Sequence, residues 1–368
     1  MPIITLLRST FTASARKVYR AVGFTKGYNF VLWLIFGGTL FAFSLIRLEY
    51  IDFWGVFCNP DRRRASGAMP GECFYFMKPG RYQIGIILHL ATILPASLLA
   101  VVQFVPIVRQ KAMYLHRING YISVFLSIAG TAGALMIARH SAGGGVDVQT
   151  FIGALAILFL GSMCLAMINI RRLQIDQHRA WMIRAWVYGS IIITMRIGLI
   201  IGALIVSAAG GHYMAQPCDK INHTLKGQNI TMKFYPECAP FFSGENLDQH
   251  VAVKANFHGD NIMEIATAFN IIFGPASWVA LIIHMIGTEL YLRLTPAEHE
   301  RLRNVSYHRQ LKAGMKNPGS AGWTADWLGD ANKWVPKTQM TTKIVSDDNK
   351  SVQGAVTSST PLLSKDSS

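Results

Sequence analysis

The sequence predicts an all-α integral membrane protein, a bundle of six transmembrane helices with both termini in the cytosol. Its composition, its long apolar runs and the placement of its basic residues lead to this prediction. Of the 368 residues, 51% are hydrophobic and 15% are charged, whereas a soluble domain carries roughly 25% charged residues. This shortage of charge excludes an ordinary soluble enzyme. The net charge of +15 therefore bears on membrane topology and not on nucleic-acid binding.

Six segments are apolar and long enough to cross a bilayer. About 20 apolar residues span a hydrocarbon core of roughly 30 Å. Each such segment must be helical, because lipid offers no hydrogen-bond partner to a free backbone amide. The six predicted spans are 28–46, 83–107, 119–138, 150–170, 185–208 and 262–292.

The spans divide the chain into a basic N-terminal arm (1–27), a transmembrane domain (28–292), a membrane-proximal segment (293–335) and a polar tail (336–368). The tail is rich in Ser, Thr, Lys and Asp, so it cannot bury enough apolar area to fold, and we expect it to be disordered.

The orientation follows from the basic residues, which favour the cytosolic side. The N-terminal arm, the loops 108–118 and 171–184 and the tail from Arg293 hold 23 of the 35 Lys and Arg residues. Because helices alternate in direction, these four regions share one side, which is predicted to be cytosolic.

The loops on the opposite side carry features of the secretory pathway. The first outer loop contains Cys58 and Cys73, and the third contains Cys218 and Cys238. All four are disulfide candidates, and the sequence leaves their pairing open. The third loop also holds two glycosylation sequons, at Asn222 and Asn229. Since disulfides and glycans form on the lumenal side, we expect a multi-pass protein of the endoplasmic reticulum or another secretory membrane.

Arg196 is the clearest polar residue at membrane depth. It lies inside the span 185–208, where a central arginine costs at least ~2.5–3.5 kcal/mol to insert. Its side chain must therefore face the bundle interior or a wet cavity. On a structural interpretation it pairs with a carboxylate or with helix carbonyls. On a functional interpretation it lines a cavity and holds an anionic or oxygen-rich ligand.

Acidic residues near the spans are few. Glu264 begins the sixth span and Glu289 ends it, so the two cannot serve one small site together. A carboxyl group in an apolar cleft has a raised pKa and can act as a general acid. Interfacial solvation or a salt bridge is the structural alternative for either residue.

The histidines fall into two layers. His89 and His140 lie toward the outer side, and His116 and His284 lie toward the cytosol. Two such pairs on facing helices could hold two bis-imidazole haems, which makes a b-type haem oxidoreductase the alternative function. A lone interfacial histidine is more often structural.

Two motifs place His-Arg at the cytosolic entrance of a span. One is His116-Arg117-x-x-Gly120, and the other is Asp176-x-His178-Arg179-x-Trp181-Met182-x-Arg184. Snorkelling toward lipid headgroups explains Arg and Trp at such positions without any function. As a cluster at the mouth of a cavity, the same cations would suit a phosphate, a carboxylate or an acidic phenol.

Together with Arg196, these motifs resemble a large, mostly uncharacterised family of bacterial and fungal polytopic membrane proteins, over roughly residues 80–290. Among fungal proteins, the chain is similar to the membrane-bound terpene cyclases of the ascofuranone type. This resemblance implies a substrate that is a prenylated aromatic with an epoxide on its terpene tail. The enzyme would open the epoxide with acid and close an oxygen heterocycle, an isomerisation that needs no metal or cofactor.

That chemistry needs a shielded proton donor and an apolar chamber for an isoprenoid that enters from the bilayer. We assign catalytic roles to Glu264 or Glu289 with Arg196 and His89, and His284 is a further candidate to orient the acid. The predicted substrate-binding residues are His116, Arg117, His178, Arg179, Arg184, Trp186 and Trp278. A transporter that binds an anion through Arg196 is a third hypothesis, disfavoured because the sequence lacks inverted repeats.

Overall fold

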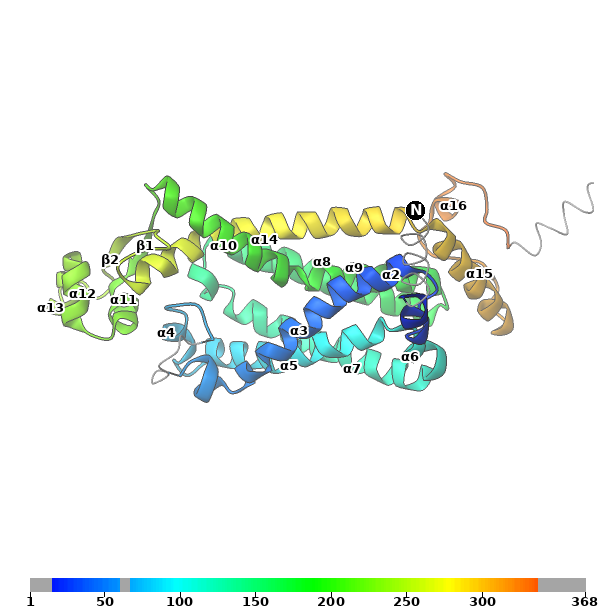
Figure 1. Cartoon of the computed structure of the whole chain (residues 1–368), viewed down its shortest axis with the longest axis horizontal. Helices are drawn as coiled ribbons and strands as arrows, with labels where there is room; N and C mark the ends of the chain where they lie inside the picture. The colour runs from blue at the N-terminus through cyan, green and yellow to red at the C-terminus, as the bar shows by residue number, and fades with distance from the viewer. Residues whose placement is uncertain (1–14, 60–66, 337–368) are drawn as a thin grey trace, which may run out of the picture. The chain divides into compact units, whose positions relative to one another are not determined.

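The computed structural model describes residues 15–59 and 67–336 (Figure 1). Most of the predicted polar tail and the first half of the N-terminal arm lie outside the described residues. Within the described part, six helices are long and apolar enough to cross a membrane, which confirms the predicted fold class. They are Gly27–Ile51, Arg81–Gln103, Met113–Ile137, Val146–Arg171, Ile175–Ala209 and Ile262–Arg293.

The chain forms two compact units, which we describe one at a time. The first comprises Met1–Met163 and Arg184–Thr288, and the second comprises Cys164–Ile183 and Glu289–Ser368.

In the first unit, the first span joins α2 (Gly27–Leu32), a π-helical turn (η1, Trp33–Gly37), α3 (Gly38–Arg47) and a 3-10 turn (η2, Leu48–Ile51). Helix α3 packs against α5 (Arg81–Gln103). A short helix, α6 (Pro106–Lys111), leads from α5 to α7 (Met113–Ile137).

Helices α5 and α7 pack along one another at very close range. A Cβ atom added at Gly133 of α7 would lie 2.6 Å from the carbonyl oxygen of Gly85 and 2.7 Å from the backbone nitrogen of His89. Small residues at such a crossing let two helix backbones approach, which is a common way to hold helices together in a membrane. Glycine at position 133 is therefore required by space and not by backbone conformation.

The remaining spans of this unit meet in an apolar core. They are α8 (Val146–Arg171), the long fifth span made of α9 (Ile175–Gly189) and α10 (Ile191–Ala209), and α14 (Ile262–Arg293). The buried residues of this core come from α8, α10 and α14, and they include Phe151, Ile191, Met195, Leu199, Ala280 and Leu281.

Two short connections complete the membrane-adjacent part of the unit. The first contains η3 (Phe53–Phe57) and α4 (Cys73–Phe76), and a disulfide joins Cys58 to Cys73. The second contains the turn η4 (Ser141–Gly143), in which Ala142 has a φ of +46°.

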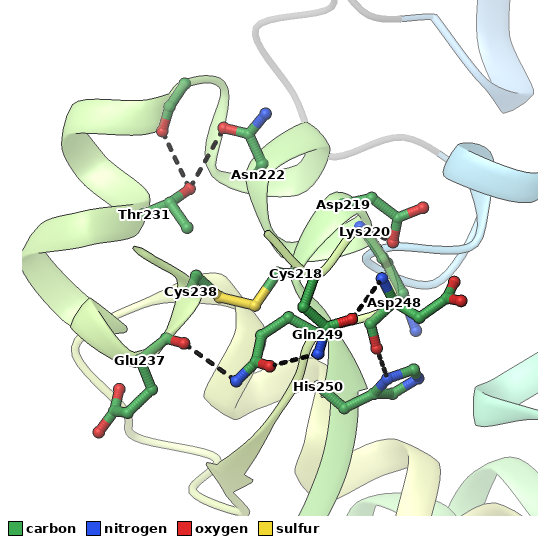
Figure 2. The surroundings of a disulfide bond; sticks show 12 residues. Cys218, Asp219, Lys220, Asn222, Thr231, Glu237, Cys238, Asp248, Gln249 and His250 are labelled. Atoms are coloured by element: carbon green, nitrogen blue, oxygen red, sulfur yellow. Dashed lines mark hydrogen bonds between the residues drawn. A yellow bond between two sulfur atoms is a disulfide. The ribbon is translucent and has the colours of Figure 1, made fainter. Parts of the chain in front are cut away.

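Residues 210–261 fold as a small disulfide-linked domain between α10 and α14. An antiparallel hairpin pairs β1 (Tyr213–Pro217) with β2 (His250–Lys254). Three short helices and a 3-10 turn lie between the strands, and a disulfide joins Cys218 to Cys238 (Figure 2). These elements are α11 (Cys218–Leu225), α12 (Gln228–Phe234), η5 (Pro236–Cys238) and α13 (Ala239–Ser243).

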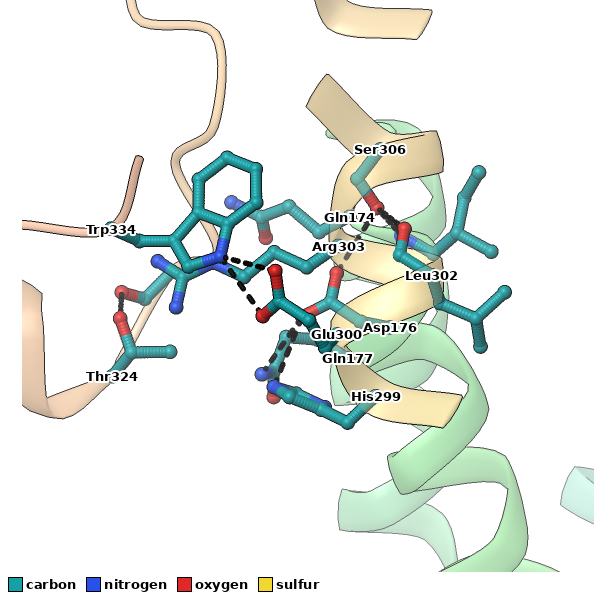
Figure 3. Close-up of polar contacts among 12 residues, drawn as sticks. Gln174, Asp176, Gln177, His299, Glu300, Leu302, Arg303, Ser306, Thr324 and Trp334 are labelled. Atoms are coloured by element: carbon teal, nitrogen blue, oxygen red, sulfur yellow. Dashed lines mark hydrogen bonds and ion pairs between the residues drawn. The ribbon is translucent and has the colours of Figure 1, made fainter. Parts of the chain in front are cut away.

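The second unit is built around the start of α9 and the helix α15 (Pro296–Lys312), followed by the single turn α16 (Ala325–Leu328). Asp176 of α9 is 1% exposed. It accepts a hydrogen bond from the Ser306 hydroxyl of α15 at 3.1 Å and lies 3.8 Å from the His299 ring (Figure 3). The interpretation of 171–184 as a loop is therefore wrong: the chain turns at Leu173 and is helical from Ile175.

Candidate functional site

A cavity of about 370 Å³ in the first unit contains the arginine that the sequence singles out. Arg196 of α10 and Arg47 of α3 both line it, so two guanidinium groups from separate membrane spans share one hollow. The rest of the lining is mainly apolar. It is formed by Phe43, Gly67, Ala68, Met69, Pro70, Leu199, Ile200 and Phe269.

The half-buried side chain of Glu72 lies next to one wall of this cavity. Glu72 accepts a hydrogen bond from the backbone N–H of Met69 at 3.0 Å, and Met69 lines the cavity. Its other oxygen accepts from the N–H of Ala142, in the turn between α7 and α8, at 2.7 Å. Glu72 therefore connects two inter-span segments and fixes the cavity wall.

Three electrostatic influences act on Glu72. Burial is the largest and raises the pKa of its carboxyl above the ordinary 4.5. The two backbone hydrogen bonds and the positive charges of Arg196 and Lys220 act in the opposite direction and reduce the shift. The pKa of Glu72 remains raised, so this carboxyl holds its proton at a higher pH than a solvated glutamate does.

Lys220 is the second cation near Glu72, and it comes from the 210–261 domain. Its side chain is 4% exposed, its Nζ donates to Gln216 Oε1 at 3.0 Å, and it lies 5.7 Å from the centre of the Tyr75 ring. Burial lowers the pKa of Lys220, and the charges of Glu72 and Asp219 oppose that effect. The small domain thus supplies a buried charge to the membrane-adjacent part of the unit.

His140 stacks on Tyr75 with the two ring centres 4.0 Å apart and meets the edge of the Tyr82 ring at 4.3 Å. Burial, followed by the charges of Arg139 and other nearby cations, lowers the pKa of His140 to about 4. His140 is therefore neutral near pH 7, as an aromatic packing partner would be.

The structure places the predicted acids away from these contacts. Glu264 lies in the first turn of α14, where its Oε1 accepts from the Asn261 side chain at 3.0 Å, so it stabilises the start of that helix. Glu289 is exposed and belongs to the second unit.

The histidines predicted as haem ligands or acid partners bridge helices. His89 Nδ1 lies 2.8 Å from the carbonyl oxygen of Gly130 and so links α5 to α7. His284 uses both ring nitrogens, Nδ1 with the Val187 carbonyl at 2.7 Å and Nε2 with the Thr194 hydroxyl at 2.8 Å. Both ring nitrogens of His284 are therefore hydrogen-bonded within the bundle.

Within the first His-Arg motif, the carbonyl of His116 accepts from the Gln103 side chain at 2.8 Å, whereas Arg117 is exposed. In the second motif, His178 Nδ1 lies 2.9 Å from the Ala166 carbonyl and Arg179 donates to the Tyr291 hydroxyl at 2.8 Å. These contacts join neighbouring helices. Arg184, the last residue of the second motif, is half-buried.

The two predicted cavity tryptophans pack on α8. Trp186 meets the edge of Phe159 with ring centres 5.6 Å apart. Trp278 meets Phe151 at 6.0 Å and donates from its Nε1 to the Asp147 carbonyl at 3.3 Å. Neither belongs to the lining of the cavity that contains Arg196.

The spans and the cavity define a multi-pass membrane protein with a mainly apolar chamber that two arginines line. Residues 86–215 match the model of a family described as a predicted membrane protein (DUF2306). That range contains both His-Arg motifs and Arg196, so the resemblance to a family of predicted membrane proteins is confirmed.

A fungal protein is similar over most of the chain. The protein named Ava biosynthesis cluster protein G, from Aspergillus versicolor, is 25% identical over 344 residues, which cover 81% of this chain and 98% of that protein. No solved structure matches this chain.

Sequence reasoning missed Glu72 and Arg47, which both precede the region of the family match. Glu72 stands in a polar loop, where an acid is normally solvated. One signal was available, because Glu72 directly precedes Cys73, and a residue next to a disulfide is held in place. Arg47 ends the first apolar run and resembles an ordinary interfacial arginine.

Proposed function

We propose that this protein is a membrane-bound terpene cyclase of secondary-metabolite biosynthesis, which opens and cyclises an epoxidised isoprenoid carried by a prenylated aromatic. The observation that carries the proposal is the half-buried carboxyl group of Glu72, hydrogen-bonded to the wall of a mainly apolar cavity that contains Arg196. The resemblance of the motifs to fungal cyclases and the name of the Aspergillus versicolor relative support a biosynthetic role.

In this proposal Glu72 is the proton donor, in place of Glu264 or Glu289. Its raised pKa favours the protonated form that an acid catalyst needs. Because Glu72 lies next to the cavity lining and not in it, the proton passes to the epoxide oxygen through one water as the carbon–oxygen bond breaks. A hydroxyl oxygen of the substrate then bonds to the electron-poor carbon and gives up its proton, which restores Glu72. Atoms and electrons balance, so the reaction is an isomerisation.

The cavity lining supplies the other requirements of this reaction. Arg196 can donate hydrogen bonds to the oxygen-bearing aromatic head of the substrate and so position its tail. Phe43 and Phe269 present aromatic rings to the chamber, and ring faces stabilise nearby positive charge by about 0.5–2 kcal/mol. The aliphatic side chains suit an isoprenoid chain that enters sideways from lipid.

The same proposal places the enzyme in the endoplasmic reticulum or another secretory membrane. The disulfides Cys58–Cys73 and Cys218–Cys238 support a lumenal location for these loops, because disulfides persist in oxidising compartments. On this view the third loop is also glycosylated, at Asn222 and Asn229.

The test is turnover of a prenylated aromatic epoxide by microsomes that contain the wild type, Glu72→Gln or Glu264→Gln. General acid catalysis contributes about 10²–10⁴-fold, so we expect Glu72→Gln to lose at least 100-fold in kcat. Glu264→Gln, which removes an acid outside the cavity, is the matched control and should keep most of the activity. Full activity of Glu72→Gln, or loss only in Glu264→Gln, would disprove the assignment of the acid. No product from the wild type with any such epoxide would disprove the cyclase.

A further inference from the structure

Two arginines line the same cavity, and none of the described residues in its lining is a carboxylate. Arg47 and Arg196 are near enough for their positive charges to repel each other. Arg47 lies 4.8 Å from the Tyr50 ring and 5.7 Å from the Phe43 ring. These rings are neutral partners, which solvate a guanidinium but leave its charge unbalanced.

The charge balance around the cavity is positive among the described residues. Glu72 is shared between two cations, Arg196 and Lys220, and Asp219 acts on Lys220. The lining therefore carries two positive charges, and protonation of Glu72 removes a nearby negative charge. Two like charges that share one cavity repel each other, so an anionic ligand between the two guanidinium groups would stabilise the site.

The apolar part of the lining indicates that the ligand also has a hydrocarbon portion. Leu199, Ile200 and Phe269 form an apolar surface beside the guanidinium groups. A volume of about 370 Å³ lies within the about 300–1,000 Å³ that is usual for small-molecule sites. The ligand that fits both features is amphipathic, with one anionic head and one hydrocarbon chain.

We propose that the cavity binds an anionic amphiphile, with a carboxylate or phenolate head held by Arg47 and Arg196 and an isoprenoid chain along Leu199, Ile200 and Phe269. This deepens the proposed function and rests on it: the substrate of the cyclase is a prenylated aromatic acid or acidic phenol and not a neutral terpene. Arginine suits this role because its planar donors pair with a carboxylate through two hydrogen bonds.

The experiment measures binding to the full-length protein in nanodiscs of phosphatidylcholine. The probes are a farnesylated hydroxybenzoic acid and its methyl ester, which differ in charge but hardly in shape. We expect the acid to bind at least tenfold more tightly than the ester in the wild type. Arg47→Gln should reduce this preference to less than threefold, Arg47→Lys should keep part of it, and Arg293→Gln, an exposed arginine outside the cavity, should leave it unchanged.

Equal binding of acid and ester by the wild type overturns the proposal, as does an acid preference that survives both Arg47→Gln and Arg196→Gln. The size-exclusion profile of each variant, together with the behaviour of Arg47→Lys, shows whether a loss reflects misfolding. Binding without turnover separates this inference from the cyclase: a retained acid preference in a protein that forms no product refutes the proposed function and leaves the anion site standing.

A lipid headgroup could supply the same negative charge, so a second arm replaces a fifth of the phosphatidylcholine by phosphatidic acid. If the acid still binds with its preference over the ester, the site is assigned to the substrate. If phosphatidic acid abolishes binding of the prenylated acid, and Arg47→Gln removes that competition, the occupant is a lipid headgroup and the substrate assignment is wrong.

Discussion

Glu72 shows how a loop residue can reach the interior of a membrane protein. Its carboxylate is held by the backbone N–H groups of Met69 and Ala142, and Ala142 is itself in a left-handed conformation with a φ of +46°. A non-glycine residue in this region is uncommon, so the turn is shaped by its surroundings. The hydrogen bond to Glu72 is one contact that holds it.

The raised pKa of Glu72 predicts the pH dependence of catalysis. In the proposed mechanism the protonated carboxyl is the active form, so the rate should fall as pH rises through this pKa, which lies above the ordinary 4.5. Stability should change in the same direction, because the folded state binds this proton more tightly than the unfolded chain does. Measuring kcat against pH for the wild type checks the prediction.

The control for that profile is Glu264→Gln, whose pH dependence should match that of the wild type. A rate that increases with pH over the same range would mean that Glu72 acts as a base or takes no part.

At the residue scale, the sequence identifies Arg196 but not Glu72. A lone cation inside an apolar run can be recognised from the sequence alone, because the bilayer makes such a charge costly wherever the helix packs. The burial of Glu72 depends on Ala142, 70 residues away in the chain, and no local pattern encodes that contact. The sequence likewise indicates how deep His284 lies in the membrane. It does not indicate the two hydrogen-bond partners of His284, which come from α9 and α10.

At the element scale, the segment predicted as the loop 171–184 is the first half of a helix. Its charged residues do not interrupt the helix because they have partners in the second unit. Asp176 accepts from Ser306 of α15 (Figure 3). Arg179 donates to Tyr291 at the end of α14. The motif that suggested a cytosolic mouth thus has a structural role in joining α9 to its neighbours.

Replacement of Asp176 tests this role. Asp176→Ala leaves the buried Ser306 hydroxyl without its carboxylate partner, and a lost buried hydrogen bond of this kind costs about 1–3 kcal/mol. We expect a lower apparent Tm of the purified protein and faster proteolysis of α15.

The matched control is Glu298→Ala in the first turn of α15, where the pair with Arg301 is partly exposed and is worth about 0–1 kcal/mol. If the two variants unfold at the same temperature, Asp176 does not hold α15 in place.

At the scale of the whole molecule, hydropathy predicted all six membrane helices, because the bilayer imposes their length and composition. The fold of residues 210–261 was not predicted. This segment packs as a soluble domain does, through a hairpin and a disulfide (Figure 2). Its core joins side chains from several short elements, such as Ile221 of α11, Cys238 of η5 and Val253 of β2, and short apolar runs leave that arrangement ambiguous.

Glycan mapping tests the predicted orientation. Asn229 is exposed on α12, and its sequon lies in the loop predicted to be lumenal. In a microsomal translation, Asn222→Gln and Asn229→Gln should each remove a glycan, which appears as a faster-migrating band. Asn304→Gln should change nothing, because its sequon lies in the predicted cytosolic segment. A glycan on Asn304 would reverse the topology.

The disulfide between Cys58 and Cys73 has a practical consequence for anyone who produces this protein. Glu72 is the immediate neighbour of Cys73, so the bond that closes the loop also positions the carboxyl group beside the chamber. In a bacterial host that keeps these thiols reduced, we expect the six membrane helices to form but Glu72 not to be held beside the cavity. Yeast or fungal microsomes are the appropriate source. Added reductant should abolish the proposed cyclase activity and leave the membrane helices folded.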